Sequence, residues 1–128
     1  RFNPNDGALL VDGNLNPGTP GVSSAAYTNN FAGTTSTTLY AIDAVADQLF
    51  TVNPPNAGTL VPVGSLGVNA DAANGFDIGG TTGTAYALFR AENNRVRIYS
   101  VNLATGQLTG KGIIGTASIN GFAVGLGF

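Results

Sequence analysis

The chain has 128 residues, of which 19 are Gly and 6 are Pro, and it contains no Cys, His, Met or Trp. Only 9% of its residues are charged, against roughly 25% in average soluble proteins, and its formal net charge is −2. This composition excludes disulfides, zinc sites built on Cys or His, cysteine nucleophiles and histidine bases. It also argues against a nucleic-acid partner, because such partners require a basic surface.

The low charge does not indicate disorder, because 43% of the residues are hydrophobic. Small neutral side chains replace the missing charges, with 14 Asn and 14 Thr. This composition is more typical of secreted, surface-layer and filament proteins than of cytosolic enzymes, so we expect an extracellular or cell-surface location. We expect no transmembrane segment, since no stretch approaches the roughly 18 apolar residues that a membrane helix needs.

Strand signals recur along the chain, whereas no helical period survives the Gly and Pro interruptions. We therefore predict one all-β domain over residues 1–128. Ten short strands are expected, in chain order at Ala8–Asp12, Val22–Thr28, Thr37–Asp43, Gln48–Asn53, Thr59–Val63, Gly75–Ile78, Thr84–Arg90, Arg95–Asn102, Gln107–Ile114 and Ile119–Leu126.

An internal repeat of about 46 residues organises these strands. The sequence Leu-Tyr-Ala-Ile at 39–42 recurs as Ala-Tyr-Ala-Leu at 85–88, and Asn-Gly-Phe at 74–76 recurs at 120–122. A hairpin pattern of Val-Asn followed by Gly-x-Leu occurs at 52–60 and at 101–108, and Phe2–Leu9 carries a related form. Ala25–Thr28 is aligned with Asn74–Asp77. Each unit thus has about four antiparallel strands, and the chain holds about two and a half units.

A four-stranded unit of this length matches a blade of a β-propeller. A closed propeller needs at least about four blades, more than this chain provides. Three arrangements remain open: an open propeller-like fragment, closure by association with other copies, or a rearranged β-sandwich. Open sheets would expose strand edges that can pair with further strands.

Six segments carry distinctive motifs, at 14–20, 25–33, 37–43, 53–60, 66–68 and 74–78, among them Asn-Leu-Asn-Pro-Gly-Thr-Pro and Asn-Pro-Pro-Asn-Ala-Gly-Thr-Leu. Through these segments the chain resembles the bacterial family known as domain of unknown function 4394, with the strongest match over about residues 14–88. The resemblance implies a secreted or envelope-associated, propeller-like protein whose relatives usually carry further repeat units before the matching part. The family has no established activity, so the resemblance implies no catalytic residues.

The acidic residues are expected to stabilise turns rather than to perform chemistry. Asp6 and Asp12 accompany Gly, and Asp43 and Asp47 lie at a hairpin end, where Asp commonly binds nearby backbone N–H groups. The less favoured alternative is a calcium site at Asp43–Asp47 or Asp71–Asp77, which lack a dense ligand loop. We predict no catalytic residue, no metal site and no cofactor.

The leading functional prediction is a non-enzymatic extracellular structural protein whose copies self-assemble through β-strand edges, into a filament or a surface layer. The partner is then another copy of the chain. The candidate subunit contacts are the apolar residues of the two terminal segments: Phe2, Leu9, Leu10, Val11, Ile119, Phe122, Val124, Leu126 and Phe128.

The alternative prediction is a propeller-like extracellular module that binds a glycan or a small ligand. Arg95 and Arg97 would share one face of a strand because side chains alternate with a period of two. The candidate ligand patch combines these cations with aromatic residues: Tyr27, Tyr40, Tyr86, Arg90, Arg95 and Arg97. A hydrolase comes third and would require two acids facing each other across a cleft.

Overall fold

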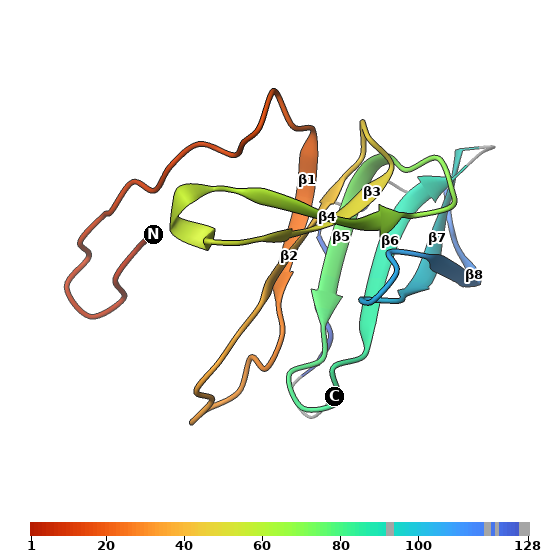
Figure 1. Cartoon of the computed structure of the whole chain (residues 1–128). Coiled ribbons are helices and arrows are strands. Elements are labelled where there is room, and N and C mark those ends of the chain that lie inside the picture. Colours follow the sequence, from red (N-terminus) through yellow and green to blue (C-terminus); the bar gives the residue numbers. More distant parts are fainter. Residues whose placement is uncertain (92–93, 117–118, 120, 126–128) are drawn as a thin grey trace.

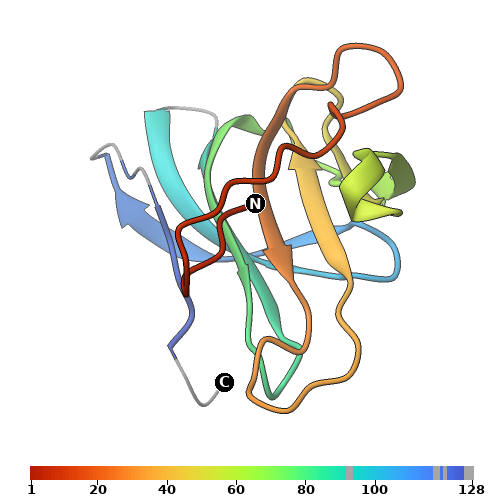
Figure 2. The same cartoon turned by 90° about the vertical axis from the view of Figure 1, so that its left-hand side faces the viewer.

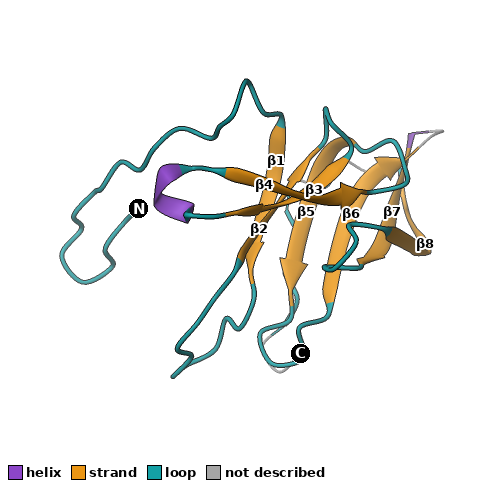
Figure 3. Ribbon diagram, in the orientation of Figure 1, coloured by secondary structure: helices purple, strands orange, loops and turns teal. Residues whose placement is uncertain are grey.

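The computed structural model describes residues 1–91, 94–116, 119 and 121–125, and it is an all-β structure with almost no helix (Figures 1 and 3). The first antiparallel sheet is formed, in chain order, by β1 (Val22–Tyr27), β2 (Leu39–Asp43), β3 (Gln48–Val52) and β4 (Leu60–Ser65), with the 3-10 turn η1 (Pro55–Ala57) before β4. The second is formed in the same way by β5 (Asp71–Ile78), β6 (Ala85–Ala91), β7 (Arg95–Val101) and β8 (Leu108–Gly115). Neither sheet closes on itself.

The main hydrophobic core lies between the two sheets, because both contribute to one cluster of buried side chains. Ile42 and Leu49 come from the first sheet, and Phe89 and Tyr99 come from the second. The rings of Phe89 and Tyr99 are tilted by 44° with their centroids 5.7 Å apart. The innermost strands β1 and β5 lie side by side, so the two sheets meet along their first strands (Figure 2).

The sequence predicts β2 to β4 and β6 to β8 to within a few residues, because β-branched and aromatic runs are separated by strong turn residues. β1 also matches its prediction, and β5 begins four residues earlier than expected. The predicted all-β class and the four-stranded unit are confirmed by the two successive sheets.

Two predicted strands are wrong. Within Ala8–Asp12, only Leu9 forms a bridge, with Phe2. The described residues of Ile119–Leu126 form no strand. Both segments have suitable side chains, but a strand is defined by a backbone partner, and neither segment has a continuous one within the described chain.

The predicted alignment of Ala25–Thr28 with Asn74–Asp77 in the repeat is also wrong, by two residues. Tyr27 pairs with Leu39, and Ile78 pairs with Ala85. Leu39 and Ala85 are equivalent under the 46-residue offset, so Tyr27 corresponds to Ile78 rather than to Phe76. A shift of two residues preserves the inward and outward faces of a strand, which is why the pattern of side chains could not reveal it.

The N-terminal arm, residues 1–16, runs outward from the first sheet and then returns to it (Figure 1). Its hairpin is closed by a hydrogen bond from the Asn3 N–H to the Ala8 carbonyl at 2.9 Å and by an ion pair between Arg1 Nε and Asp12 Oδ2 at 2.9 Å. Asn16 then forms a parallel bridge with Thr59, next to β4. The arm is therefore attached to the fold at one end while its hairpin projects into solvent.

The described residues of the C-terminal segment, 119 and 121–125, approach β5 of the same chain. The Val124 N–H donates to Asp77 Oδ2 at 2.7 Å. A Cβ added to Gly75 would lie 2.5 Å from Phe122 Cβ, so the two backbones are in close contact. Within the described residues, no helix is long and apolar enough to cross a membrane.

Candidate functional sites

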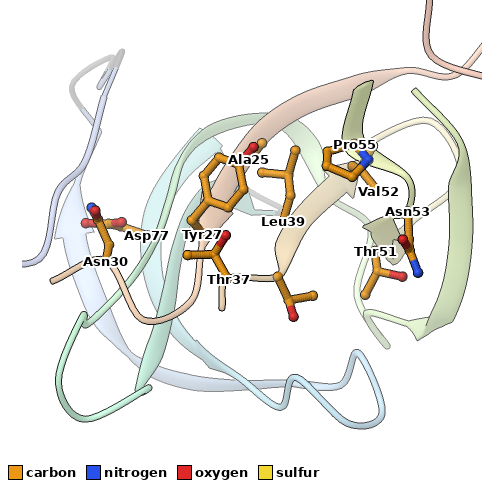
Figure 4. Close-up of a pocket in the computed structure, with 12 residues that line it drawn as sticks. Ala25, Tyr27, Asn30, Thr37, Leu39, Thr51, Val52, Asn53, Pro55 and Asp77 are labelled. Atoms are coloured by element: carbon orange, nitrogen blue, oxygen red, sulfur yellow. The ribbon is translucent and has the colours of Figure 1, made fainter. Parts of the chain in front are cut away.

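A pocket of about 770 Å³ opens on the first sheet, where β1 ends, β2 begins and β3 ends (Figure 4). Its wall is rich in neutral polar groups, with the hydroxyls of Thr37 and Thr51 and the amides of Asn30 and Asn53. The ring of Tyr27, whose residue is 43% exposed, lies between Asn30 on one side and Asn53 on the other (Figure 4). The pocket can therefore offer hydrogen bonds together with one aromatic face.

The charges around this pocket restrict its chemistry. Among the described residues that line the pocket, Asp77 is the only charged one, and none is Lys or Arg. Both carboxylate oxygens of Asp77 accept backbone N–H groups, from Ile78 at 2.9 Å and from Val124 at 2.7 Å. The described part of the lining thus contains one carboxylate, where glycoside hydrolysis requires two, and none of the cations that an anionic ligand would prefer.

The structure brings only one member of the predicted ligand patch to this pocket. Tyr27 lines it, whereas Tyr40 packs against the main core and Tyr86 lies within β6, opposite Asp77. Arg90 is also on β6 and does not line the pocket. The predicted ligand patch relies on aromatic and charged residues. Thr and Asn side chains give no comparable indication of a binding site in the sequence.

Arg95 and Arg97 are both exposed on β7 and occupy alternate positions of the strand. They therefore share one face, as the period of two predicts. They do not belong to the lining of the pocket.

Asp43 is the one buried charged residue among those described, at 4% exposure. Its Oδ1 accepts the N–H groups of Val45 and Ala46, both at 2.9 Å, and its Oδ2 accepts that of Gly21 at 2.9 Å. Asp47 Oδ1 similarly accepts the Ala70 N–H at 2.7 Å. Asp43 therefore stabilises the β2–β3 turn, and Asp47 connects that turn to the segment before β5. No group of three His, Cys, Asp or Glu side chains in the described chain comes together as a metal site.

The hairpin of the N-terminal arm carries the most exposed apolar side chains of the predicted subunit contacts. Phe2, Leu9, Leu10 and Val11 are between 57% and 94% exposed. The edge strand β8 adds Ile113 and Ile114, which are about half exposed and were not predicted as contacts. The arm and β8 thus carry two separate groups of exposed apolar side chains, at opposite ends of the molecule in Figure 1.

The C-terminal residues predicted as subunit contacts lie in a different environment from those of the N-terminal arm. Ile119, Phe122 and Val124 are half-buried, and the last two approach β5 of the same chain. Leu126 and Phe128 lie outside the described residues.

The two outer sheet edges, β4 and β8, both carry features that hinder pairing with a further strand. Pro62 lies in β4 and has no N–H to donate, and Lys111 lies in β8. Proline and lysine are common on edge strands, where they hinder unwanted pairing. Bulges interrupt both strands at the same point, beside Phe50 in β3 and Tyr99 in β7. These devices disfavour long, regular edge-to-edge pairing.

No curated protein matches the chain. The model of a family described as domain of unknown function (DUF4394) matches residues 1–123, well beyond the segment on which the resemblance rested. Because this match covers nearly the whole sequence, including both sheets and the N-terminal arm, the chain belongs to the DUF4394 family.

Proposed function

We propose that the protein is an extracellular, non-enzymatic structural protein whose copies associate with one another. The observation that carries the proposal is the hairpin of the N-terminal arm, which exposes Phe2, Leu9, Leu10 and Val11 together. Exposed apolar groups that gather on one surface, rather than being scattered singly, are typical of protein interaction sites. The composition supports the proposal as well, because 9% charged residues provide little repulsion between copies.

The first test is the state of association of the 128-residue protein. We expect oligomers or filaments whose fraction rises with concentration, measured by light scattering after size exclusion and by electron microscopy. A monodisperse monomer at millimolar concentration would contradict the proposal. The replacement of Val11 by Ser should weaken association, whereas Val45→Ser is the matched control, since Val45 is 83% exposed but lies in the β2–β3 turn.

The pocket favours a second function, the binding of a neutral glycan. Hydroxyl and amide groups around one exposed tyrosine ring suit a polyhydroxylated ligand, which offers both hydrogen-bonding groups and apolar C–H faces. The absence of cations from the lining disfavours acidic sugars and phosphates. This function is compatible with self-association, because the pocket does not include the exposed apolar residues of the arm.

This second function is tested with an array of neutral oligosaccharides, followed by titration calorimetry with any ligand retained. Tyr27→Ala should abolish binding. Phe31→Ala is the control, because Phe31 is a similarly exposed aromatic residue that does not line the pocket. Equal loss in both variants, or retention of acidic glycans alone, would contradict the proposal.

A further inference from the structure

The two sheets and the N-terminal arm share a seven-residue motif, Gly-x-Leu-x-x-x-Gly, which the strand register identifies. It occurs at Gly7–Gly13, Gly58–Gly64 and Gly106–Gly112. In each copy the first glycine ends a hairpin turn with a positive φ, of 74°, 69° and 84° in chain order. The turn is closed each time by an Asn N–H, from Asn3 to Ala8, Asn53 to Thr59 and Asn102 to Gln107, at 2.8–3.0 Å.

The motif copies contact each other in succession along the chain. The turn of the second copy lies against the end of the first. A Cβ added to Gly58 would overlap the carbonyl oxygen of Asn14 and lie 2.9 Å from that of Gly13, and a Cβ added to Gly13 would lie 2.9 Å from the carbonyl oxygen of Ala57. The Gly13 N–H also donates to the Asn56 carbonyl at 2.8 Å. Both glycines are therefore required for this approach of two backbones.

The third copy contacts the second through the corresponding pair of glycines, although the hydrogen bond beside them joins other positions. A Cβ on Gly106 would lie 2.5 Å from the Gly64 carbonyl oxygen, and one on Gly64 would overlap the carbonyl oxygen of Thr105. The Leu108 N–H then donates to the Leu66 carbonyl at 3.0 Å. The chain thus forms one type of contact twice, between the first glycine of a motif and the last glycine of the motif before it.

Two motif glycines have no such partner: the first glycine of the first motif and the last glycine of the third motif. Gly7, the first glycine of the first motif, would meet no atom of the described residues within 4 Å if it carried a Cβ. The same is true of Gly112, the last glycine of the third motif. These two open halves of the contact are complementary, because they are the halves that join at Gly13–Gly58 and at Gly64–Gly106.

The burial of the side chains also distinguishes the first hairpin from the other two. Val52 and Leu60 flank the second hairpin and are 4% and 6% exposed, and their equivalents Val101 and Leu108 are 7% and 8% exposed. The equivalent residues of the first hairpin, Phe2 and Leu9, are 65% and 78% exposed. The first hairpin therefore lacks the cover that the other two hairpins receive.

We infer that the hairpin turn at Gly7 of one copy docks on the β8 backbone at Gly112 of a second copy, in the geometry that Gly58 and Gly106 adopt within the chain. This inference rests on the proposed self-association and specifies its surfaces. The contact is heterologous, so it propagates head to tail into a closed ring or an open filament.

Two substitutions test the contact without disturbing the fold of the single chain. Gly112→Ala adds a methyl group that meets no described atom of the monomer within 4 Å but would overlap the docked turn. Its control is Gly110→Ala on the same strand, where the nearest atom of the chain lies at 3.9 Å. Gly7→Asn keeps a residue that tolerates positive φ, and Gly83→Asn is its control, at another open hairpin turn with a φ of 68°.

We expect Gly7→Asn and Gly112→Ala each to weaken association at least about tenfold, with the wild-type circular dichroism spectrum retained. Neither control should change association. In an equimolar mixture, the two defective variants should form heterodimers, because each retains the half that the other has lost. Sedimentation velocity measures all of these species.

The outcomes separate the two proposals. Wild-type protein that remains monomeric would contradict the proposed function and the inference together. Wild-type protein that assembles, while Gly7→Asn and Gly112→Ala assemble equally well, would overturn only the docking surfaces inferred here. Loss of association in each variant without recovery in the mixture would overturn the head-to-tail geometry, since a symmetric interface gives no complementation.

Discussion

Gly75 of β5 and Phe122 of the C-terminal segment are in direct contact, with the Phe122 backbone nitrogen 2.8 Å from the position that a Cβ on Gly75 would occupy. Gly75 is itself buried. The absence of a side chain at this position therefore lets the C-terminal segment lie against the innermost strand of the second sheet.

We predict that Gly75→Ala destabilises the protein by about 1–3 kcal/mol, because the added methyl group must displace the backbone or side chain of Phe122. Thermal and urea unfolding followed by circular dichroism measure this change. The control is Gly121→Ala, whose methyl group would meet nothing within 4 Å and should cost less than about 0.5 kcal/mol. Equal effects of the two variants would contradict the contact.

Asp77 is predicted to hold the same segment through the Val124 N–H. Asp77→Ala removes this charged acceptor, so the Val124 amide should exchange its hydrogen about tenfold faster, as expected for the loss of about 1.4 kcal/mol. Asp77→Asn should restore much of the protection, since its side-chain oxygen can still accept. Unchanged exchange in Asp77→Ala would show that the bond does not hold the segment.

Asp43 is predicted to be the acidic residue whose removal is most costly. Asp43→Ala would leave the N–H groups of Gly21, Val45 and Ala46 without their acceptor, at a cost of about 2–4 kcal/mol in the free energy of unfolding. Asp6→Ala is the comparison, because exposed Asp6 accepts one bond, from Ala8, and should cost about 1 kcal/mol or less. Chemical denaturation measures the free energy of unfolding of both variants. A larger loss in Asp6→Ala than in Asp43→Ala would contradict this prediction.

Leu49 is predicted to be essential to the core that joins the sheets. It is fully buried in β3, so Leu49→Ala should cost about 2–5 kcal/mol through lost burial and the cavity left behind. Leu10→Ala makes the same chemical change at an exposed site and should leave the unfolding midpoint unchanged when both proteins are measured at a concentration that keeps them monomeric. A small effect at Leu49 would show that the two sheets do not depend on this shared core.

The sequence predicted the eight strands because their signals are local. Pro54, Pro55 and Gly58 form the turn that ends β3 and precedes β4. The adjoining apolar runs then pair, antiparallel, with the strands that are their neighbours in the sequence. The segments around Leu9 and Phe122 carry the same local signals, but whether they form strands depends on a partner strand that local sequence does not specify.

The candidate sites were harder to predict than the fold. Tyr27 was identified, but its pocket is completed by Thr37, Thr51 and Asn53, and such residues are too frequent in this chain to single out. The motif that begins at Gly7 is likewise predicted from the sequence only as a turn. The contacts between motif copies depend on the placement of Gly58 against Gly13 and of Gly106 against Gly64, which local sequence does not specify.

The succession of contacts between motif copies also affects how such a molecule can change in evolution. Each motif copy contacts the next copy through its last glycine and the previous copy through its first. Duplication of one sheet would therefore duplicate both glycines that form the contact. A longer subunit could therefore arise in a single genetic event, and its ends would still match those of the shorter form.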